Sequence, residues 1–368
     1  MTIPRVVLHV DFDYFFAQVE ERENSAIRNQ PVVVCVYSGR GGDHGAVSTA
    51  NYVARKYGVR SGMPIIYAKK RLKNVEAVFL PVNRVLYDKV SENIMNVLCG
   101  YADNFEQVGV DEAFLDVTKR VGGNYERGQK LASEIKKRIL AEEKITCSIG
   151  VGPNKLVAKI AANSQKPNGL TVVSPAEVQS FLASLSVREL VGVGRKTEDA
   201  LKKLGIETNR QLATYDVTEL ISVFGKTLGM YLHNASLGVD ESPVEQRGRA
   251  ESVSRIVTLK ENTRDLTVMM REVDKLAKDI LKAVEQGLSF RSISISAVME
   301  DLSMVTRSKT FQRPVENLED MKKAAGDLLV QLLRKETERL VRRIGLKISS
   351  FIEEKGQKRL KDFDMRVQ

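Results

Sequence analysis

The chain has 368 residues, of which 43% are apolar and 28% charged, and its formal net charge is +10. This length allows more than one buried core, and the basic balance favours a polyanionic partner. No uncharged apolar run approaches about 18 residues and no secretory signal opens the chain, so we expect a cytoplasmic protein without a membrane segment. Cys35, Cys99 and Cys147 are widely spaced in apolar runs, which predicts buried reduced thiols.

The chain opens with RVVLHVDFDYFF, a strand-like run rich in β-branched residues, and Asp11 and Asp13 stand at the end of the strand. Further on, the apolar runs FEQVGV and AFLDV flank Asp111 and Glu112, which predicts a hairpin with these acids near its tip. Neighbouring side chains on a strand point to opposite faces, so the last two acids can share an ion only if the chain bends there. A solvated turn is the alternative for this stretch taken alone.

Two such strands can bring Asp11, Asp111 and Glu112 to one point. Hard oxygen ligands in this number suit Mg²⁺. Two such ions about 4 Å apart activate an attacking hydroxyl and stabilise the leaving oxygen of a phosphoryl displacement. The pattern therefore predicts nucleotidyl transfer. The three histidines, His9 among them, are scattered, so a histidine-ligated metal or a Ser-His-Asp site has little support.

A buried strand at QPVVVCVYSG leads into the Gly-rich loop SGRGGDHGAV. The next run, STANYVARKYGV, predicts a helix that opens with Ser48 and Thr49 and carries Tyr52 and Arg55 along one side. Loop N–H groups, a hydroxyl at a helix start and an Arg just inside it would form a triphosphate clamp. The alternative is an ordinary capped helix whose Tyr packs and whose Arg is solvated.

The elements up to residue 169 form an alternating pattern. Helices are expected over 83–102 and 124–143, with the acidic hairpin between them, and the strand ITCSIGVG and the helical run NKLVAKIAANSQKPNG follow. Together with the first strand this is a βαββαβ order, typical of a ferredoxin-like sheet in an α+β protein.

From about residue 174 short helices replace strands. The run ELVGVGRKTEDALKKLGI sets Gly192 and Gly194 before a basic helix start at Lys196, the pattern of a helix-hairpin-helix whose N–H groups approach a DNA phosphate. Residues 219–238 resemble a looser second copy. Plain helix packing is the alternative.

A polar stretch at 238–251 reads as a linker, and a second βαββαβ order follows, with helices over 266–287 and 316–336 and without paired acids at strand ends. We interpret this unit as a DNA-binding module, with solvated strand faces as the alternative. Its strands carry six cations: Arg255, Arg307, Lys309, Arg342, Arg343 and Lys347.

The tail spaces Gln357, Leu360 and Phe363 as Q-x-x-L-x-x-F. One helical turn there would present Leu360 and Phe363 to a groove on a partner. A disordered end with chance apolar residues is the alternative.

Several long motifs occur together and in order: VDFDYFFAQVE, VCVYSGR, GAVSTANYVARKYGVRSGMP, GVDEAFLDV, SIGVGPNKLVAKIAANSQKPNG and VGVGRKT. Over almost its whole length the chain resembles the Y-family lesion-bypass DNA polymerases of the archaeal DNA polymerase IV type. The resemblance implies a right-hand fold with a ferredoxin-like palm (1–14 and 83–173), small fingers (15–82), a helical thumb (174–237), a linker (238–251), a tethered βαββαβ little finger (252–352) and a clamp-binding tail (353–368).

The resemblance also implies residue roles. Asp11, Asp111 and Glu112 would be the catalytic acids and, with the carbonyl of Phe12, would hold two Mg²⁺ ions, for which Mn²⁺ is a substitute. Small residues would form the roof over the base pair, and Ser48 stands where Ala is expected. The other carried-over residues are the nucleotide contacts Phe15, Phe16, Thr49, Tyr52, Arg55 and Lys166, the sugar-discriminating Phe16, and the roof residues Ala46 and Ser48.

The implied partners are primer–template DNA, dNTPs and a sliding clamp, contacted by a monomer that copies damaged DNA with low fidelity and no proofreading. One rival is a nucleotide cyclase, which also uses ferredoxin-like palms with metal carboxylates. The helix-hairpin-helix and the basic C-terminal unit argue against it. The other rival is a non-catalytic DNA-binding scaffold on the same fold, which would be expected to have lost some metal acids, whereas all three are present.

Overall fold

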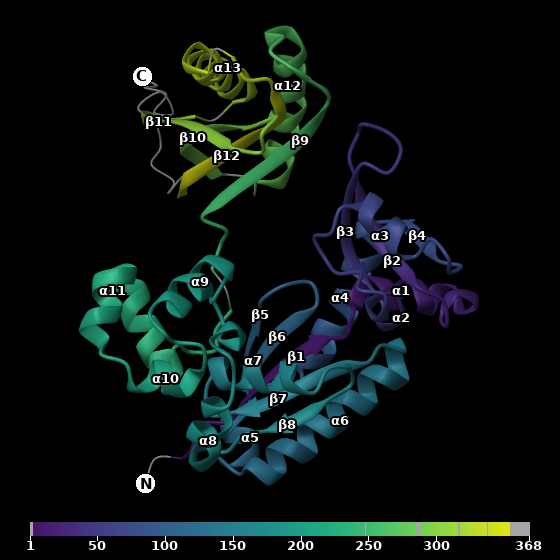
Figure 1. Cartoon of the computed structure of the whole chain (residues 1–368), viewed down its shortest axis with the longest axis vertical. Coiled ribbons are helices and arrows are strands. Elements are labelled where there is room, and N and C mark those ends of the chain that lie inside the picture. The colour runs from purple at the N-terminus through teal and green to yellow at the C-terminus, as the bar shows by residue number, and fades with distance from the viewer. Residues whose placement is uncertain (1–2, 247, 285–287, 316, 337, 354–368) are drawn as a thin grey trace, which may run out of the picture. The chain divides into compact units, whose positions relative to one another are not determined.

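The computed structural model describes residues 3–246, 248–284, 288–315, 317–336 and 338–353, whose elements are labelled in Figure 1. They form two compact units. The first holds the described residues of 1–36 and 46–247, and the second those of 37–45 and 248–368. Among these residues no helix is both long and apolar enough to cross a membrane.

The first unit is built on a five-stranded sheet. Its strands lie in the order β5 (Asn104–Gln107), β6 (Glu112–Asp116), β1 (Val7–Phe12), β7 (Cys147–Gly152) and β8 (Leu170–Val172). β1 is antiparallel to both of its neighbours, and β8 is parallel to β7. The first four strands with the two helices between them are the predicted ferredoxin-like βαββαβ order.

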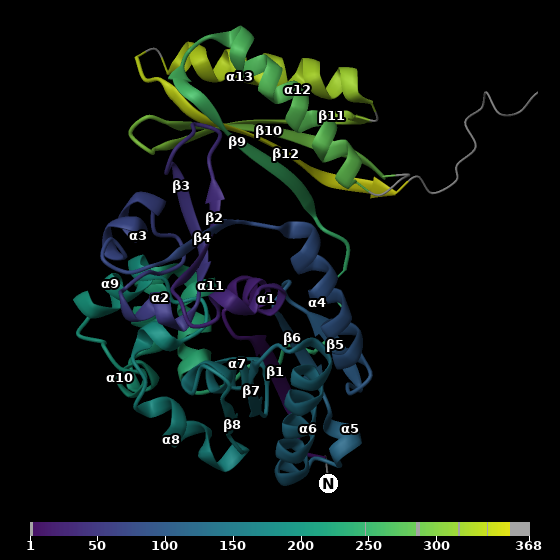
Figure 2. The same cartoon turned by 90° about the vertical axis from the view of Figure 1, so that its right-hand side faces the viewer.

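Side chains of β1 alternate between two different environments. Leu8 and Val10 belong to the core under α4 (Arg84–Cys99) and α6 (Tyr125–Glu143), which lie side by side in Figure 2. Val7 packs instead with Phe114 of β6 and with Ala158 of helix α7 (Lys155–Ser164). His9 and Asp11 therefore share the α7 face of the sheet.

Helix α7 approaches the sheet unusually closely at Gly150. A Cβ atom on this residue would lie 2.0 Å from the Ala158 carbonyl oxygen and 2.3 Å from the Ala162 nitrogen, so only glycine fits. The close packing holds the polar side chains of α7 over the ends of β1 and β6.

A smaller sheet, in the order β3 (Gly45–Ala50), β2 (Val32–Tyr37) and β4 (Val78–Pro81), packs with α2 (Tyr52–Lys56) and α3 (Ile65–Arg71). The predicted helix start at Ser48 and Thr49 is wrong, because both residues lie on β3. The helix begins at Tyr52, since the Asn51 side chain accepts the Ala54 N–H at 2.9 Å and caps it.

Short helices follow α7. They are η2 (Pro175–Glu177), α8 (Val178–Ala183), η3 (Val187–Glu189), α9 (Arg195–Lys203), α10 (Asn209–Thr214) and α11 (Val217–Ser236). Three further helices precede them in the chain: α1 (Phe15–Glu23), η1 (Ser25–Ile27) and α5 (Thr118–Val121). α11 bends at Gly225, whose φ of 77° interrupts the helix.

The second unit also has the predicted βαββαβ succession, but its strands are arranged differently. The sheet order is β11 (Met304–Val315), β10 (Leu288–Met299), β12 (Val341–Glu353) and β9 (Ser252–Thr263), with every neighbouring pair antiparallel. The first strand is therefore at an edge, whereas β1 is inside its sheet. Helices α12 (Leu266–Ala283) and α13 (Leu318–Lys335) cover one face, and in the described part of this unit no helix covers the other, which we call the helix-free face (Figure 1).

Two of the three cysteines agree with the sequence prediction. Cys35 and Cys147 are buried, but Cys99 is exposed. The prediction for Cys99 is wrong because this residue is the last of α4, where its neighbour Leu98 takes the buried position.

Asp13, the second acid of the first motif, has a structural role. Its side chain is 1% exposed and accepts hydrogen bonds from Thr146 Oγ1 (2.9 Å), Ser148 Oγ (2.7 Å) and the Asn168 backbone N–H (2.8 Å). These donors satisfy the buried carboxylate without a metal ion. Asp13 therefore joins the end of β1 to β7 and to the segment after α7.

We predict that Asp13→Ala lowers the free energy of unfolding of the first unit by about 2–4 kcal/mol, because three buried donors lose their acceptor. Urea unfolding of the full chain measures this. The control is Asp88→Ala, an exposed acid of α4 whose loss should change stability by less than about 0.5 kcal/mol. Equal effects of the two substitutions would contradict the structural role.

Candidate active site

Strand pairing brings the predicted acids together. Asp11 lies directly opposite Glu112 in the β1–β6 ladder, so their side chains share a face. Asp111 immediately precedes β6, and its carbonyl oxygen accepts the Phe12 N–H at 2.8 Å. β5 and β6 are antiparallel, as the predicted hairpin requires, with residues 108–111 connecting them.

The tightest group of ligand atoms contains a residue that the sequence analysis set aside. One atom each of His9, Asp11 and Glu112 lies within 4.8 Å of the others, and Asp111 is not in this group. His9 is fully buried, and its Nε2 lies 3.2 Å from Glu112 Oε2. The available signal was the spacing of His9 and Asp11, which puts both on one face of a strand.

The electrostatics of the group divide its members. Burial raises the pKa of Asp11 against the opposing effect of Lys166, and burial followed by the Glu112 charge raises the pKa of Asp111. The hydrogen bond from His9 is the largest cause that lowers the pKa of Glu112, and the hydrogen bond and charge of Lys159 add to it. Together they bring this pKa to about 2.

Burial lowers the pKa of His9, so the ring is neutral near pH 7. Its Nε2–H then donates to Glu112, while Nδ1 has no partner among the described residues. This contact fixes the orientation of the Glu112 carboxylate.

Two lysines pair with the acids. Lys159 Nζ is 2.6 Å from Glu112 Oε2, and Lys166 Nζ is 2.6 Å from Asp11 Oδ2. Lys166 was predicted to contact nucleotide, whereas Lys159 was not predicted to have a role. Its position on α7, fixed by the close approach at Gly150, brings it to the site.

A cavity of about 230 Å³ opens beside the acids, and most of the predicted nucleotide contacts line it. Its lining residues are Asp11, Phe12, Tyr14, Phe15, Phe16, Ser48, Thr49, Tyr52, Arg55, Ser61, Asp111 and Lys166. Ala46 and Glu112 are not among them. The Gly-rich loop at 38–45 belongs to the second unit, so its part in the predicted clamp stays a prediction.

Aromatic packing holds the floor of this cavity. The Phe16 ring stacks on Tyr87 with centroids 4.3 Å apart, and the Arg84 guanidinium lies 5.4 Å from the Phe16 centroid. The Arg55 guanidinium lies 4.7 Å from the centroid of the Tyr52 ring, and Arg55 Nε donates to the Ala50 carbonyl oxygen at 2.9 Å. These contacts pre-orient Phe16, Tyr52 and Arg55.

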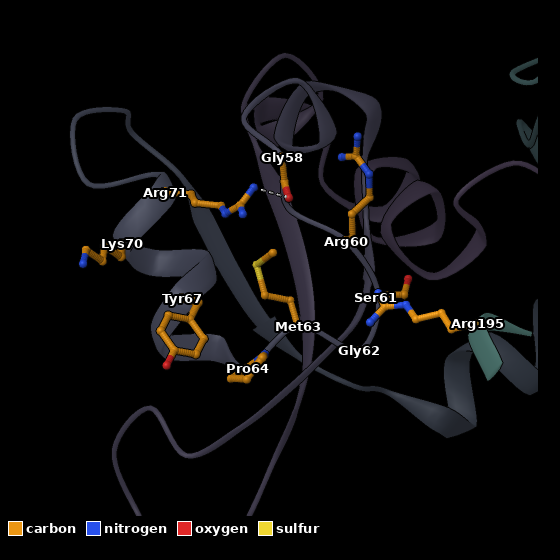
Figure 3. A pocket seen from close by; sticks show the side chains of 10 residues that line it. All are labelled: Gly58, Arg60, Ser61, Gly62, Met63, Pro64, Tyr67, Lys70, Arg71 and Arg195. Atoms are coloured by element: carbon orange, nitrogen blue, oxygen red, sulfur yellow. Dashed lines mark hydrogen bonds between the residues drawn. The ribbon is translucent and has the colours of Figure 1, made fainter. Parts of the chain in front are cut away.

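A second, larger pocket of about 970 Å³ is basic (Figure 3). Its lining residues are Gly58, Arg60, Ser61, Gly62, Met63, Pro64, Tyr67, Lys70, Arg71 and Arg195, none of them acidic. Ser61 lines both pockets, so the two adjoin. The sequence analysis did not identify this pocket.

Arg60 and Arg71 of this pocket donate hydrogen bonds to backbone carbonyl oxygens. Arg60 Nη1 donates to Arg55 O at 2.6 Å, and Arg71 Nη1 donates to Gly58 O at 2.9 Å. Neither arginine forms a salt bridge with an acid in the described part of the chain. The pocket is therefore a concentrated positive charge, and the Tyr67 side chain beside it is 59% exposed.

The predicted helix-hairpin-helix residues adjoin a helix start. Gly192 has a φ of 83° and Gly194 is the N-cap of α9, where no side chain of the described residues caps the first N–H groups. Lys196 is exposed in the first turn. Free N–H groups and a cation are thus presented together.

The strand register separates the predicted cations of the second unit. Arg307 and Lys309 lie opposite the buried Ile295 and Ile293, on the face that the helices cover. Arg255 is opposite Leu346 on that same face, at the edge strand.

Of the six predicted cations, Arg343 and Lys347 alone lie on the helix-free face. Lys347 is opposite Ser294 and Ser254, among the hydroxyl side chains of this face, and Arg343 is opposite Val298 and Thr258. Arg342 is half-buried beside a register shift. The six cations therefore do not form one surface. Gln357, Leu360 and Phe363 of the tail lie outside the described residues.

Three family models match the chain. The impB/mucB/samB family matches residues 10–163, the DNA polymerase-iota thumb domain matches residues 188–240, and the impB/mucB/samB family C-terminal domain matches residues 250–361. The chain belongs to the Y-family DNA polymerases of the archaeal DNA polymerase IV type.

Relatives of that name are similar over nearly the full length. DNA polymerase IV 1 of Methanosarcina mazei is 44% identical over 98% of this chain and 99% of the relative, and DNA polymerase IV of Nitrosopumilus maritimus is 43% identical over 96% and 98%. A solved Y-family polymerase chimera of Dbh and Dpo4 covers 95% of this chain and 99% of its own, with 42% identity and a TM-score of 0.89. The fold is a right-hand polymerase with palm, fingers, thumb and little finger.

Proposed function

We propose that this chain is a template-directed DNA polymerase that extends a primer with dNTPs by two-metal-ion nucleotidyl transfer and copies damaged DNA at low fidelity without proofreading. The observation that carries the proposal is one cavity lined by two of the predicted metal acids, Asp11 and Asp111, and by the cations Arg55 and Lys166. Carboxylates and cations lining one cavity suit a metal-bound triphosphate. Ternary-complex structures of the similar Dbh DNA polymerase support it.

The donor set fits Mg²⁺. The side chains of Asp11, Asp111 and Glu112 offer hard oxygen ligands, and burial raises the pKa of both aspartates, as expected for negative charge that lacks a divalent partner. We assign these acids and the Phe12 carbonyl as the ligands of two ions, with Mn²⁺ as a substitute. The ions would polarise the reacting phosphate and favour the deprotonated primer hydroxyl.

The chain's own residues would orient the substrate. Arg55 and Lys166 would bind the triphosphate, Thr49 and Tyr52 would donate hydroxyl hydrogen bonds to it, and Phe16 would exclude a ribose 2′-OH. His9 would keep Glu112 in one orientation. Ser48 would contact the base pair from β3, with Ala46 two residues earlier on the same side of the strand.

We assign DNA contacts to three surfaces. The start of α9, with Gly192, Gly194 and Lys196, would bind a backbone phosphate. The helix-free face of the second unit would lie along the duplex through Arg343 and Lys347, and this face replaces the six-cation surface expected from sequence. The basic pocket, which adjoins the nucleotide cavity, would take the single-stranded template ahead of the copied base, with Tyr67 stacking on a base.

The domain boundaries expected from sequence are part of this proposal, as are a monomeric state, a cytoplasmic location and a sliding-clamp contact through Gln357, Leu360 and Phe363. The scaffold alternative would be expected to lack some of the metal acids, whereas Asp11, Asp111 and Glu112 are all present. Primer extension with each dNTP and Mg²⁺ tests the proposal directly, since a scaffold or a cyclase would not extend a primer.

We predict that Asp111→Ala or Glu112→Ala reduces primer extension by at least about 10³-fold, because each removes a metal ligand, while affinity for primer–template changes less than about threefold. Single-turnover extension and fluorescence anisotropy measure the two quantities on one preparation. The control is Asp88→Ala. Parallel loss of extension and binding would contradict the assignment.

Phe16→Ala should raise ribonucleotide incorporation relative to dNTP use by roughly 10- to 200-fold, because the ring that would collide with the 2′-OH is removed. Single-nucleotide insertion with matched rNTP and dNTP measures the ratio. The control Phe16→Tyr keeps the ring and should keep the exclusion. An unchanged ratio in Phe16→Ala would assign Phe16 to packing against Tyr87 alone.

Neutralising the helix-free face should reduce the salt dependence of DNA binding. The double substitution of Arg343→Gln and Lys347→Gln should lower the log–log slope of affinity against salt by about 1.8, since each phosphate contact contributes roughly 0.9. Anisotropy at several salt concentrations measures the slope. The matched control, Arg307→Gln with Lys309→Gln, should leave it unchanged, and the reverse outcome would assign DNA to the other face.

The basic pocket should recognise the template overhang and not the duplex. Arg60→Gln with Lys70→Gln should weaken binding to primer–template with a 5′ overhang by roughly fivefold or more at low salt, and binding to a blunt duplex much less. Lys73→Gln, an exposed cation outside the pocket, is the control. Equal losses on both DNAs would contradict a template-specific role.

A further inference from the structure

Two ammonium groups occupy oxygen atoms that the proposed metal ions require. Lys159 Nζ lies 2.6 Å from Glu112 Oε2, and Lys166 Nζ lies 2.6 Å from Asp11 Oδ2. Each of these four side chains is 16–24% exposed, so solvent screens the pairs only partly. Both lysines come from one continuous stretch, α7 and the segment directly after it.

An ammonium and a divalent ion cannot share a carboxylate oxygen at such distances without strong mutual repulsion. Two positive charges that close to one another repel strongly, because the effective dielectric near a protein surface is much lower than that of bulk water. A metal ion that binds Asp11 or Glu112 must therefore displace the lysine or bind with reduced affinity. His9 differs, because its neutral N–H adds no net charge and can remain on Glu112.

We infer that Lys159 and Lys166 are internal counter-ions of the metal site, which hold Glu112 and Asp11 until metal ions displace them. The inference rests on the proposed function, since it takes the two acids as metal ligands. It adds Lys159 to the site and gives Lys166 a second role, in which its ammonium moves from Asp11 to the triphosphate.

This exchange couples the two ligands of the enzyme. A nucleotide that attracts Lys166 frees Asp11 for a metal ion, and a metal ion on Asp11 frees Lys166 for the nucleotide. By thermodynamic linkage each ligand then raises the affinity for the other by the same factor. The free protein keeps its acids neutralised and binds metal weakly until substrate arrives.

The chain contains a matched comparison. Lys155, on the same helix, pairs with Glu106 at 2.8 Å, with 18% of the lysine side chain and 8% of the glutamate side chain exposed. Glu106 is not part of the metal-ligand group. The substitution Lys155→Gln is therefore a control, because it removes an ion pair of α7 that does not involve a proposed metal ligand.

The test measures Mn²⁺ binding to the full chain by electron paramagnetic resonance, without DNA or nucleotide. Lys159→Gln and Lys166→Gln should each increase Mn²⁺ affinity by roughly fivefold or more, because the competing cation is gone, whereas Lys155→Gln should not change it. Unchanged or weaker binding in the first two variants would overturn the inference, since the lysines would then hold the acids for the metal.

Thermal unfolding of the same proteins is the second measurement. In EDTA, Lys159→Gln and Lys166→Gln should melt below the wild type, because an acid is left unpaired, and Mg²⁺ should raise their melting temperatures more than that of the wild type. Lys155→Gln should show the loss without the larger Mg²⁺ response. An equal Mg²⁺ response in all proteins would overturn the inference.

A measurement on the unmodified chain covers the case in which a variant does not fold. Acylation of lysines, read residue by residue by mass spectrometry, should become faster at Lys159 and Lys166 when Mg²⁺ saturates the protein and stay constant at Lys155. Constant rates at all three would overturn the inference. Primer extension by the wild type separates this result from the proposed function, because extension without ammonium release refutes only the exchange.

Discussion

The burial of carboxylates is the constraint on which the candidate active site depends. Asp11 and Glu112 face each other across the β1–β6 ladder, and Asp111 precedes β6. Burial raises the pKa of Asp11 and Asp111, which marks the cost of holding negative charge there. The surrounding structure offsets this cost with donors and cations that come from distant parts of the chain.

The two acids of the first motif show how position determines role. Asp13 is satisfied by three donors and needs no ion, whereas Asp11 pairs with Lys166 and lines the nucleotide cavity. The first stabilises the junction of β1 and β7, and the second remains available for a metal ion. A satisfied carboxylate favours folding, and an incompletely satisfied one favours ligand binding.

Two units with the same succession of strands and helices perform different tasks. In the first, the opening strand is central, and its end joins the acidic hairpin. In the second, the opening strand is at the edge, and the central strands β10 and β12 carry hydroxyl groups on the helix-free face. Succession alone therefore does not determine function, because strand order decides which side chains meet.

Local signals in the sequence were sufficient for much of the architecture. The β-branched runs, the acidic hairpin, the long helices and the glycine turn before α9 are all determined by residues close in the chain, and the structure contains each of them. The resemblance to Y-family polymerases identified most of the residues that line the nucleotide cavity. The helix start at Ser48 and Thr49 was one local error, because the pairing of β3 and the Asn51 cap override the helical pattern.

Only the tertiary structure revealed the environment of the acids. His9 and Lys159 meet Glu112 at sequence separations of 103 and 47 residues, over which no periodic pattern carries information. Likewise, strand register decided that Arg343 and Lys347 lie on the helix-free face while Arg307 and Lys309 do not. The physical reason is that composition and spacing specify which groups a segment presents, whereas pairing register and the close approach of α7 at Gly150 specify which groups come within reach of one another.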